Sequence, residues 1–263
     1  MSYTRRKFSE AYAIQHAEKG NNRFGTYNFA DDEVVHYTTV NYRPGLITKH
    51  AEYSVMYHSD RDVIAIYFQG TADAGDWSAN FTVSTKDWRT VTFNGNKVKI
   101  KVHKGWYNMY NAMKSAIHKE YEALKKAHAN AELEIIGHSL GAGMAQICAE
   151  EMYYTYGVKS HCFTFGSVKP FYFESSDAKG YLQSCCKEVY NFCDNSDIVC
   201  YLPPFDNFDH INAVWLDYAN SGLNYKIDNV FSYHFVYDIE ALYEATDVYK
   251  DGVPTLETNK VTY

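Results

Sequence analysis

A serine flanked by glycines, placed between a predicted strand and a predicted helix, is the feature that most restricts how this chain can fold. Residues 132–136 (ELEII) have the composition of a short buried strand, and residues 140–156 that of a helix ending at Gly157. Between them lies a G-x-S-x-G sequence formed by Gly137, His138, Ser139, Leu140 and Gly141. This order predicts a tight strand–turn–helix junction with a strained serine, where the glycines leave room for the neighbouring strand and helix.

The G-x-S-x-G pattern alone is weak evidence for chemistry, because it arises by chance in about one chain in ten of this length. The strand before it and the small-residue helix after it are what a nucleophile elbow requires, and a glycine turn without chemistry is the alternative. A nucleophilic serine needs a base, and the base needs an acid that orients it. The candidates downstream of Ser139 include Asp194, Asp197, Asp206 and Asp209 as the acid, and His161, His210 and His234 as the base.

The rest of the chain predicts antiparallel strands in its first half and alternating strands and helices in its second half. A hairpin is expected over residues 90–93 and 98–102, because Asn94-Gly95 suits a two-residue turn. Apolar residues at three- and four-residue spacing predict a long helix over residues 106–129. Further strands are predicted at residues 54–57, 62–69, 161–165 and 188–192, and further helices at residues 9–19 and 235–245. The fold class is therefore α/β, with a mixed, mostly parallel central sheet flanked by helices.

No repeat or long linker divides the chain, so we expect a single domain over residues 1–263. Residues 1–50 are expected to form a helical lead-in and residues 246–263 a polar C-terminal tail. Acidic residues outnumber basic ones by 32 to 25, which argues against nucleic acid as the partner. The longest apolar run, residues 63–68, is far shorter than the ~20 residues of a membrane-spanning helix, so no integral membrane segment is expected.

The N-terminal residues and the cysteines indicate in which cellular compartment the protein is expected. Arg5, Arg6 and Lys7 are followed by polar and aromatic residues where an export signal would have an apolar stretch. The six cysteines show no spacing typical of a zinc site. We therefore expect a cytoplasmic protein with reduced thiols and no metal site.

Five blocks of sequence occur in one order along the chain: residues 63–71, 76–81, 102–106, 137–141 and 195–204. Together they resemble the class 3 lipase family, the fungal-type triacylglycerol lipases with an α/β-hydrolase fold. The G-x-S-x-G block is similar to the family's elbow, and residues 102–106 (VHKGW) resemble its Val-His-x-Gly-Phe. Residues 195–204 (NSDIVCYLPP) resemble its Asp-x-Val-Pro-x-Leu-Pro-Pro. The other two blocks are residues 63–71 (VIAIYFQGT) and residues 76–81 (DWSANF). The agreement of five blocks in one order is more specific than any single motif.

The resemblance implies a role for each matching residue. Ser139 is expected to be the nucleophile, Asp197 the acid and His234 the base. The oxyanion hole is expected at the backbone N–H of Leu140 together with Thr71. The lid-like segment would lie at residues 72–81 and include Asp76, Trp77 and Phe81. His210 falls in a stretch that is structural in the family, so packing or a backbone hydrogen bond is its expected role.

The chain also departs from the family pattern. Gln69 stands where the family usually has Arg, and Cys200 stands where it commonly has Pro. The lid-like segment contains only two large apolar residues, Trp77 and Phe81. A lid that opens onto an oil surface should offer a wider apolar face, so we expect ester hydrolysis with only modest activation at an interface.

The expected function is a serine carboxylic-ester hydrolase, lipase-like, that cleaves acylglycerol or related lipid esters through an acyl-enzyme. No cofactor is expected. The expected partners are a lipid or small ester substrate and, transiently, a lipid interface. A phospholipase or a short-chain esterase on the same triad is the first alternative. A binding module that retains the fold without turnover is the second.

Overall fold

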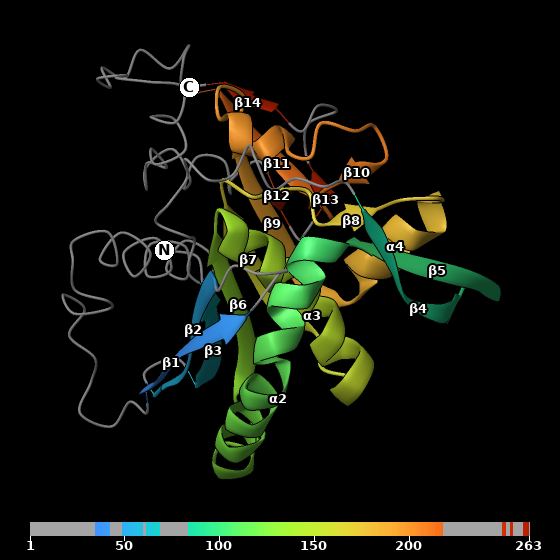
Figure 1. The fold of residues 1–263 in the computed structure, drawn as a ribbon. Helices are drawn as coiled ribbons and strands as arrows, with labels where there is room; N and C mark the ends of the chain where they lie inside the picture. Colours follow the sequence, from blue (N-terminus) through green and yellow to red (C-terminus); the bar gives the residue numbers. More distant parts are fainter. Residues whose placement is uncertain are drawn as a thin grey trace, which may run out of the picture.

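The computed structural model describes residues 35–42, 49–59, 62–68, 84–217, 249–250, 253–254 and 260–262. An eight-stranded sheet in the order β1-β2-β3-β6-β7-β9-β11-β14 forms its centre (Figure 1). The first three strands, β1 (Val35–Tyr42), β2 (Lys49–His58) and β3 (Val63–Phe68), pair antiparallel. From β3 onward every neighbouring pair is parallel. The expected mixed, mostly parallel sheet is thus confirmed.

The parallel strands are β3, β6 (Glu132–His138), β7 (Ser160–Phe165), β9 (Cys186–Asp194), β11 (Ala213–Asp217) and β14 (Lys260–Thr262). Every residue of β3 and β7 is buried. Continuous burial means that both faces of the sheet are covered, as is usual for parallel strands. The carboxyl ends of these strands lie along one edge of the sheet, and the predicted serine follows β6 there.

Two helices, α2 (Lys104–Ala127) and α3 (Leu140–Tyr156), pack against each other and against the sheet (Figure 1). The buried residues of α2 recur at three- and four-residue spacing, from Trp106 to Leu124, as the sequence predicts. Residues 141–152 of α3 are all buried, so this helix lies inside the fold. Gly157 ends α3 in the left-handed conformation that glycine favours. None of the helices in the described ranges is long and apolar enough to cross a bilayer.

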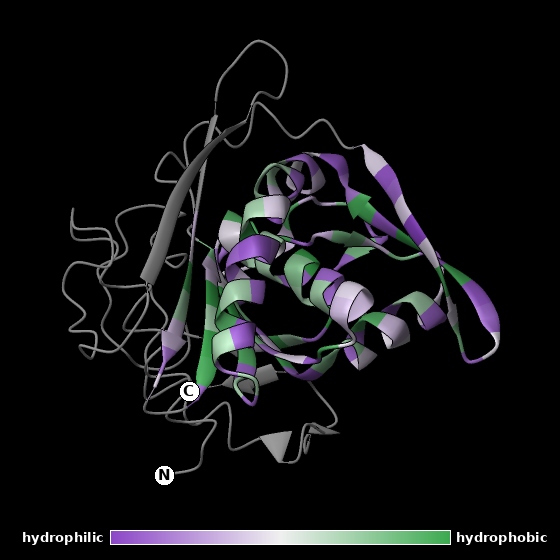
Figure 2. Cartoon of the chain, turned by 90° about the horizontal axis from the view of Figure 1, so that it is seen from below, coloured by the Kyte–Doolittle hydropathy of each residue, from purple (hydrophilic) through white to green (hydrophobic). Residues whose placement is uncertain are grey.

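A smaller antiparallel sheet has the order β10-β8-β5-β4. Its main part is the predicted hairpin of β4 (Thr85–Phe93) and β5 (Asn96–His103), whose turn residues Asn94 and Gly95 both have positive φ. The hairpin projects from the edge of the molecule and alternates hydrophobic and hydrophilic residues along its length (Figure 2). Two short strands, β8 (Phe171–Tyr172) and β10 (Phe208–Asp209), complete this sheet.

An ion-pair cluster ties the hairpin to α3, the helix that follows the predicted serine. Arg89 of β4 lies between Glu150 and Glu151 of α3, and its Nε is 3.4 Å from the Glu150 carboxylate. Glu150 is buried, and this burial raises the pKa of its carboxyl to about 7, although Arg89 opposes the shift. The cluster thus joins the hairpin to the C-terminal half of α3.

The structure corrects the helical lead-in assignment and shows short strands within the C-terminal tail. Residues 35–42 form β1 and residue 49 begins β2, so the lead-in over residues 1–50 is not helical there. Val, Tyr and Thr, which recur over residues 35–42, are residue types that are common in strands, and β1 pairs with β2. The polar tail contains β12 (Tyr249–Lys250), β13 (Val253–Pro254) and β14, and β14 adds to the main sheet beside β11. The helices predicted at residues 9–19 and 235–245 lie outside the described residues.

Candidate active site

Ser139 occupies the sharp turn between β6 and α3. Its φ of 62° and ψ of −126° lie in a region that residues with a side chain rarely adopt. The turn is held by two hydrogen bonds: the Ser139 amide donates to the Phe165 carbonyl (2.9 Å), and the Ala142 amide donates to the Ser139 carbonyl (3.1 Å). The Ser139 side chain makes no capping hydrogen bond to α3, so its hydroxyl is not occupied by the helix.

Gly137 allows this turn to close. A Cβ at this position would lie 2.4 Å from the Gly141 carbonyl oxygen and 2.6 Å from the Gly141 carbonyl carbon. Both atoms belong to the backbone, so no side-chain movement could relieve the contact. The first glycine of the motif is therefore required because strand and helix pass so close together, as the sequence predicts.

The N-terminus of α3 supplies positive potential beside Ser139. Leu140 is the first residue of the helix, and the first N–H groups of a helix have no partner within it. These groups also carry the positive end of the helix dipole. No acidic residue stands in the first turn of α3 to neutralise it. The Leu140 N–H is thus suited to bind an oxygen that becomes negative near the serine.

Asp197 follows β9 at the same edge of the sheet. β7 alone separates β9 from β6, and the carboxyl ends of parallel strands meet at one edge. Asp197 is fully buried and caps a short 3-10 helix, η2 (Ile198–Tyr201). Its Oδ1 accepts a hydrogen bond from the Val199 amide (3.0 Å), and its Oδ2 accepts one from the Cys200 thiol (3.4 Å). A buried carboxylate held through both oxygens is suited to orient a base.

The other acidic candidates have different surroundings. Asp194 ends β9, and its Oδ1 accepts a hydrogen bond from the Ser196 amide (2.6 Å), which stabilises the turn before Asp197. Asp209 forms an ion pair with Lys179 (2.6 Å) in the smaller sheet. Asp206 is exposed. Among the candidates, Asp197 is the one that is both buried and beyond the end of β9.

Two of the three candidate histidines can be placed. His161 is at the start of β7, at the opposite edge of the sheet from Ser139, where it contacts Glu188 (2.5 Å) and Glu132 (2.8 Å). His210 is fully buried, and its Nε2 lies 3.0 Å from the Cys200 carbonyl and 3.6 Å from the Cys193 sulfur. The backbone hydrogen bond agrees with the structural role expected for His210.

The remaining predicted site residues lie outside the described residues. They are Thr71, Asp76, Trp77, Phe81 and His234. The structure therefore brings Ser139, Leu140 and Asp197 to one edge of the sheet, together with the elbow residues Gly137, His138 and Gly141. In the part of the chain that it describes, no group of three or more His, Cys, Asp or Glu side chains could hold a metal ion.

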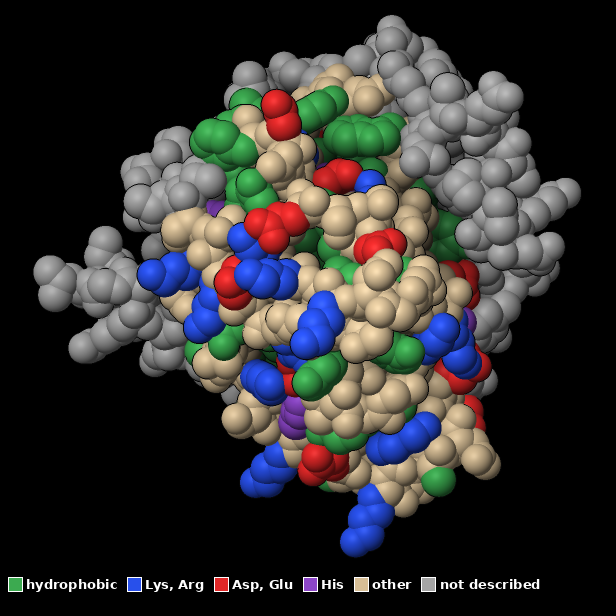
Figure 3. Space-filling view, turned by 90° about the vertical axis from the view of Figure 1, so that its right-hand side faces the viewer, with side chains coloured by type: hydrophobic (Ala, Val, Ile, Leu, Met, Phe, Trp, Pro, Cys, Tyr) green, Lys and Arg blue, Asp and Glu red, His purple; other side chains and the backbone are tan. Residues whose placement is uncertain are grey.

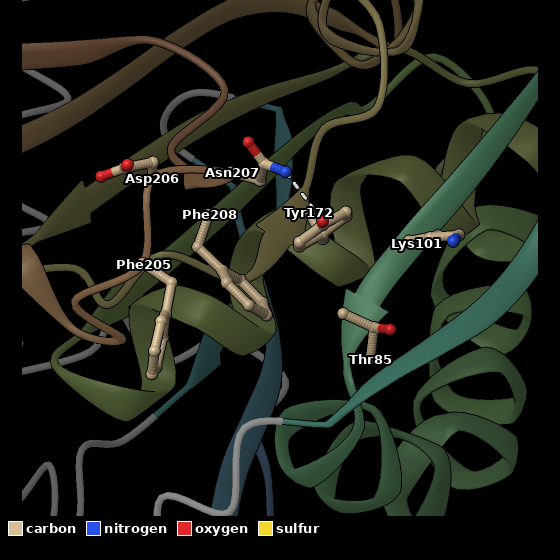
Figure 4. Close-up of a pocket in the computed structure, with 7 residues that line it drawn as sticks. All are labelled: Thr85, Lys101, Tyr172, Phe205, Asp206, Asn207 and Phe208. Carbon is tan, nitrogen blue, oxygen red and sulfur yellow. Dashed lines mark hydrogen bonds between the residues drawn. The ribbon is translucent and has the colours of Figure 1, made fainter.

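An open cavity of about 470 Å³ lies on the smaller sheet, lined by Thr85, Lys101, Tyr172 and residues 205–208 (Figure 4). Its polar groups are partly engaged: Asn207 donates to the Tyr172 hydroxyl (2.7 Å), and Lys101 pairs with Glu174, which lies outside the lining (2.5 Å). None of the predicted catalytic residues lines it. No sequence pattern indicated this cavity, because its walls come from four separate parts of the chain.

Sequence reasoning also missed the thiol beside Asp197. Cys200 was notable only as a departure from the family pattern, whereas the structure places its sulfur on the Asp197 carboxylate. The two residues are three apart in the chain, and a 3-10 turn brings residues at this spacing together. All six cysteines are buried thiols, and none forms a disulfide.

The parallel sheet, the covering helices and the serine elbow define an α/β-hydrolase fold. The sequence profile of the family described as Lipase (class 3) matches residues 65–207, which is more than half of the chain. The chain therefore belongs to the class 3 lipase family, as its sequence blocks indicated. It is a lipase-like serine hydrolase of carboxylic esters.

Solved lipase structures share the fold at low sequence identity. The triacylglyceride lipase of Rhizomucor miehei is 18% identical, with a TM-score of 0.60 over 80% of each chain. Lipase II from Rhizopus niveus is 18% identical, with a TM-score of 0.58 over 78% of this chain and 76% of that one. A triacylglycerol lipase whose catalytic centre is formed by a serine protease triad is 18% identical, with a TM-score of 0.59 over 82% of this chain and 81% of that one. Comparison with curated protein sequences found no significant match.

Proposed function

We propose that Ser139, Asp197 and His234 form the catalytic triad of this hydrolase, with the N–H of Leu140 and Thr71 as the oxyanion hole. The observation that carries the proposal is the strained Ser139 backbone at the carboxyl end of a central parallel strand and the N-terminus of α3. The buried Asp197 carboxylate beyond β9 supports it. So does the serine protease triad of a lipase that shares the fold.

The proposed reaction runs through an acyl-enzyme. His234 accepts the proton of the Ser139 hydroxyl while the serine oxygen attacks the ester carbonyl carbon. The carbonyl oxygen becomes negative and is bound in the oxyanion hole. His234 then gives its proton to the leaving alcohol as the ester C–O bond breaks. A water molecule then gives a proton to His234 and attacks the acyl carbon. The bond from that carbon to the serine oxygen breaks, His234 returns the proton to the serine oxygen, and the acid is released.

We expect a fluorophosphonate probe to label the protein covalently at Ser139, because a triad activates this serine far beyond an ordinary hydroxyl. Mass spectrometry of the intact protein and of its peptides gives the stoichiometry and the site. Ser139→Ala is the control and should remain unlabelled. An unlabelled native protein that is folded, or equal labelling of the control, would contradict the proposal and favour a binding module.

We propose a lipid or small ester as the substrate, with transient contact between the protein and a lipid interface. Ile198, Tyr201 and Phe205, in the eight residues that follow Asp197, are 45%, 40% and 46% exposed. Hydrophobic side chains gather toward the upper end of the face in Figure 3, whereas Lys and Arg side chains are scattered below them. Exposed apolar side chains this close to the catalytic acid suit a lipid surface.

We expect measurable hydrolysis of short soluble esters and only modest activation at an interface, because the lid-like segment has few large apolar residues. A p-nitrophenyl ester series from short to long acyl chains, with and without detergent, measures both properties. Trp77→Ala should reduce activity on long chains more than on short ones. Strong activation on emulsions with negligible activity on soluble esters would contradict this expectation.

The exposed apolar residues can be tested in the same assay. Phe205→Ala should lower activity on emulsified esters while leaving soluble short-chain esters nearly unchanged. Tyr154→Ala is the matched control, because Tyr154 is 57% exposed near the far end of α3 from Ser139. Equal effects of the two variants on emulsions would argue against an interface at this position. A preference for phospholipid or short-chain esters would select the corresponding alternative function.

A further inference from the structure

A buried thiol contacts the proposed catalytic acid. The Cys200 sulfur is 3.4 Å from Asp197 Oδ2, and both residues have no exposed surface. The Val199 amide occupies the other carboxylate oxygen, Oδ1, at 3.0 Å. Because the two donors bind different oxygens, together they set the rotation of the carboxylate plane.

Cys200 is itself held in place by its neighbours. His210 Nε2 lies 3.0 Å from the Cys200 carbonyl, and a carbonyl only accepts, so Nε2 carries a hydrogen and donates it. The Cys193 sulfur lies 3.6 Å from the same nitrogen. The Cys200 amide also donates to the Asp197 carbonyl (3.2 Å). These contacts hold the Cys200 backbone in place, and its side chain is fully buried beside Asp197.

We propose that Cys200 is a positioning residue: its S–H holds the Asp197 carboxylate in the orientation that directs the catalytic base. The inference rests on the proposed function, in which Asp197 is the acid of the triad. Proline, common at this position in the family, has no side-chain donor, so this contact distinguishes the present chain. Neither the serine elbow nor the three triad residues by themselves require this contact between Cys200 and Asp197.

The contact has a predictable effect on pH dependence. A thiol that donates to Asp197 partly neutralises the carboxylate charge. When this donor is removed, the carboxylate stabilises the protonated base more strongly, and the pKa of the base rises. The base must be neutral to accept the serine proton, so the acid limb of the kcat profile moves to higher pH. A loose carboxylate also orients the base less well, which lowers kcat without affecting substrate binding.

The test compares Cys200→Ala and Cys200→Ser with the native protein, and kcat is expressed per site titrated with a fluorophosphonate. Cys200→Ala should lower kcat about 10-fold, leave KM within about twofold and move the acid limb up by roughly 0.5 pH unit. Cys200→Ser restores a donor to Asp197, and a hydrogen bond donated by a hydroxyl is shorter and stronger than one donated by a thiol. It should restore kcat to within about threefold and move the acid limb below that of the native protein.

Cys162→Ala is the matched control, because Cys162 is a fully buried thiol in β7 that does not contact Asp197. It should leave both the acid limb and kcat per titrated site unchanged. If Cys200→Ala behaves like Cys162→Ala, or if Cys200→Ser does not restore kcat, the inference is wrong. If Cys200→Ala does not fold, the inference is tested by Cys200→Ser alone. In that case, an acid limb of the Cys200→Ser kcat profile equal to that of the native protein overturns the inference.

Asp197→Asn separates this inference from the function on which it rests. A large loss of kcat in Asp197→Asn, with no effect of Cys200→Ala, would contradict only the role of Cys200. Full activity of Asp197→Asn would contradict the proposed triad itself. The expected result is a large loss of kcat in Asp197→Asn and a smaller, pH-dependent loss of kcat in Cys200→Ala.

Discussion

His234→Ala is expected to lower kcat by about 10⁴-fold or more while the protein remains folded. Without the imidazole, the Ser139 proton has no acceptor, and only the oxyanion hole and substrate binding continue to accelerate the reaction. Steady-state kinetics on a soluble ester measures the loss. Circular dichroism and thermal unfolding show whether the fold is retained.

His210→Ala and Asp197→Asn complete this experiment. His210→Ala should mainly reduce stability, because the ring is fully buried and its Nε2 bonds to the Cys200 carbonyl. Asp197→Asn should lower kcat by about 10³- to 10⁴-fold, since an amide favours the wrong tautomer of the base. Activity that survives His234→Ala but disappears in a folded His210→Ala would make His210 the base.

Gly137→Ala is expected to destabilise the fold by more than about 4 kcal/mol or to prevent folding. Its Cβ would lie 2.4 Å from the Gly141 carbonyl oxygen, and both the strand and the helix are anchored in the core. Relief would require moving β6 away from α3, which carries the buried residues 141–152. Urea unfolding followed by circular dichroism gives the free energy of unfolding, and the yield of soluble protein gives a first indication.

Gly180→Ala is the control for this substitution. Gly180 lies in α4 (Ser176–Ser184), and a Cβ there would meet the Phe93 ring edge at 3.2 Å, a contact that a small ring movement relieves. Alanine also favours a helix by about 1 kcal/mol relative to glycine, so the net change should be small. A Gly137→Ala protein as stable as Gly180→Ala would show that the elbow is less tightly packed than described.

The elements with strong local signals were predictable in detail. α3 has the bounds predicted from its composition and Gly157, and the β4–β5 hairpin turns at Asn94-Gly95. Apart from the nine-residue helix α4, the elements that were missed are short strands or depend on distant partners: β8 and β10 have two residues each, and β14 forms by pairing with β11. A strand of two or three residues has too little pattern of its own to be recognised.

The candidate site likewise contains residues that the sequence predicted and residues whose surroundings it did not predict. The elbow around Ser139 follows from contiguous residues, and Asp197 was selected by motif order. The roles of Thr71, His234 and the lid-like segment stay predictions, as does the cytoplasmic location. What distinguishes His210 from a base is its burial against Cys200 and Cys193, which no periodicity in its own segment indicates.

The sequence by itself determined the fold class, the nucleophile elbow and the family, because each depends on residues adjacent in the chain or on motifs in a set order. Only the tertiary structure decided which groups meet Asp197, where β1 and β14 join the sheet and which candidate histidine is enclosed. These outcomes depend on β6, β7 and β9 lying side by side and on residues far apart being buried together. Contacts of this kind are selected by the packing of the whole domain, and local sequence patterns do not encode them.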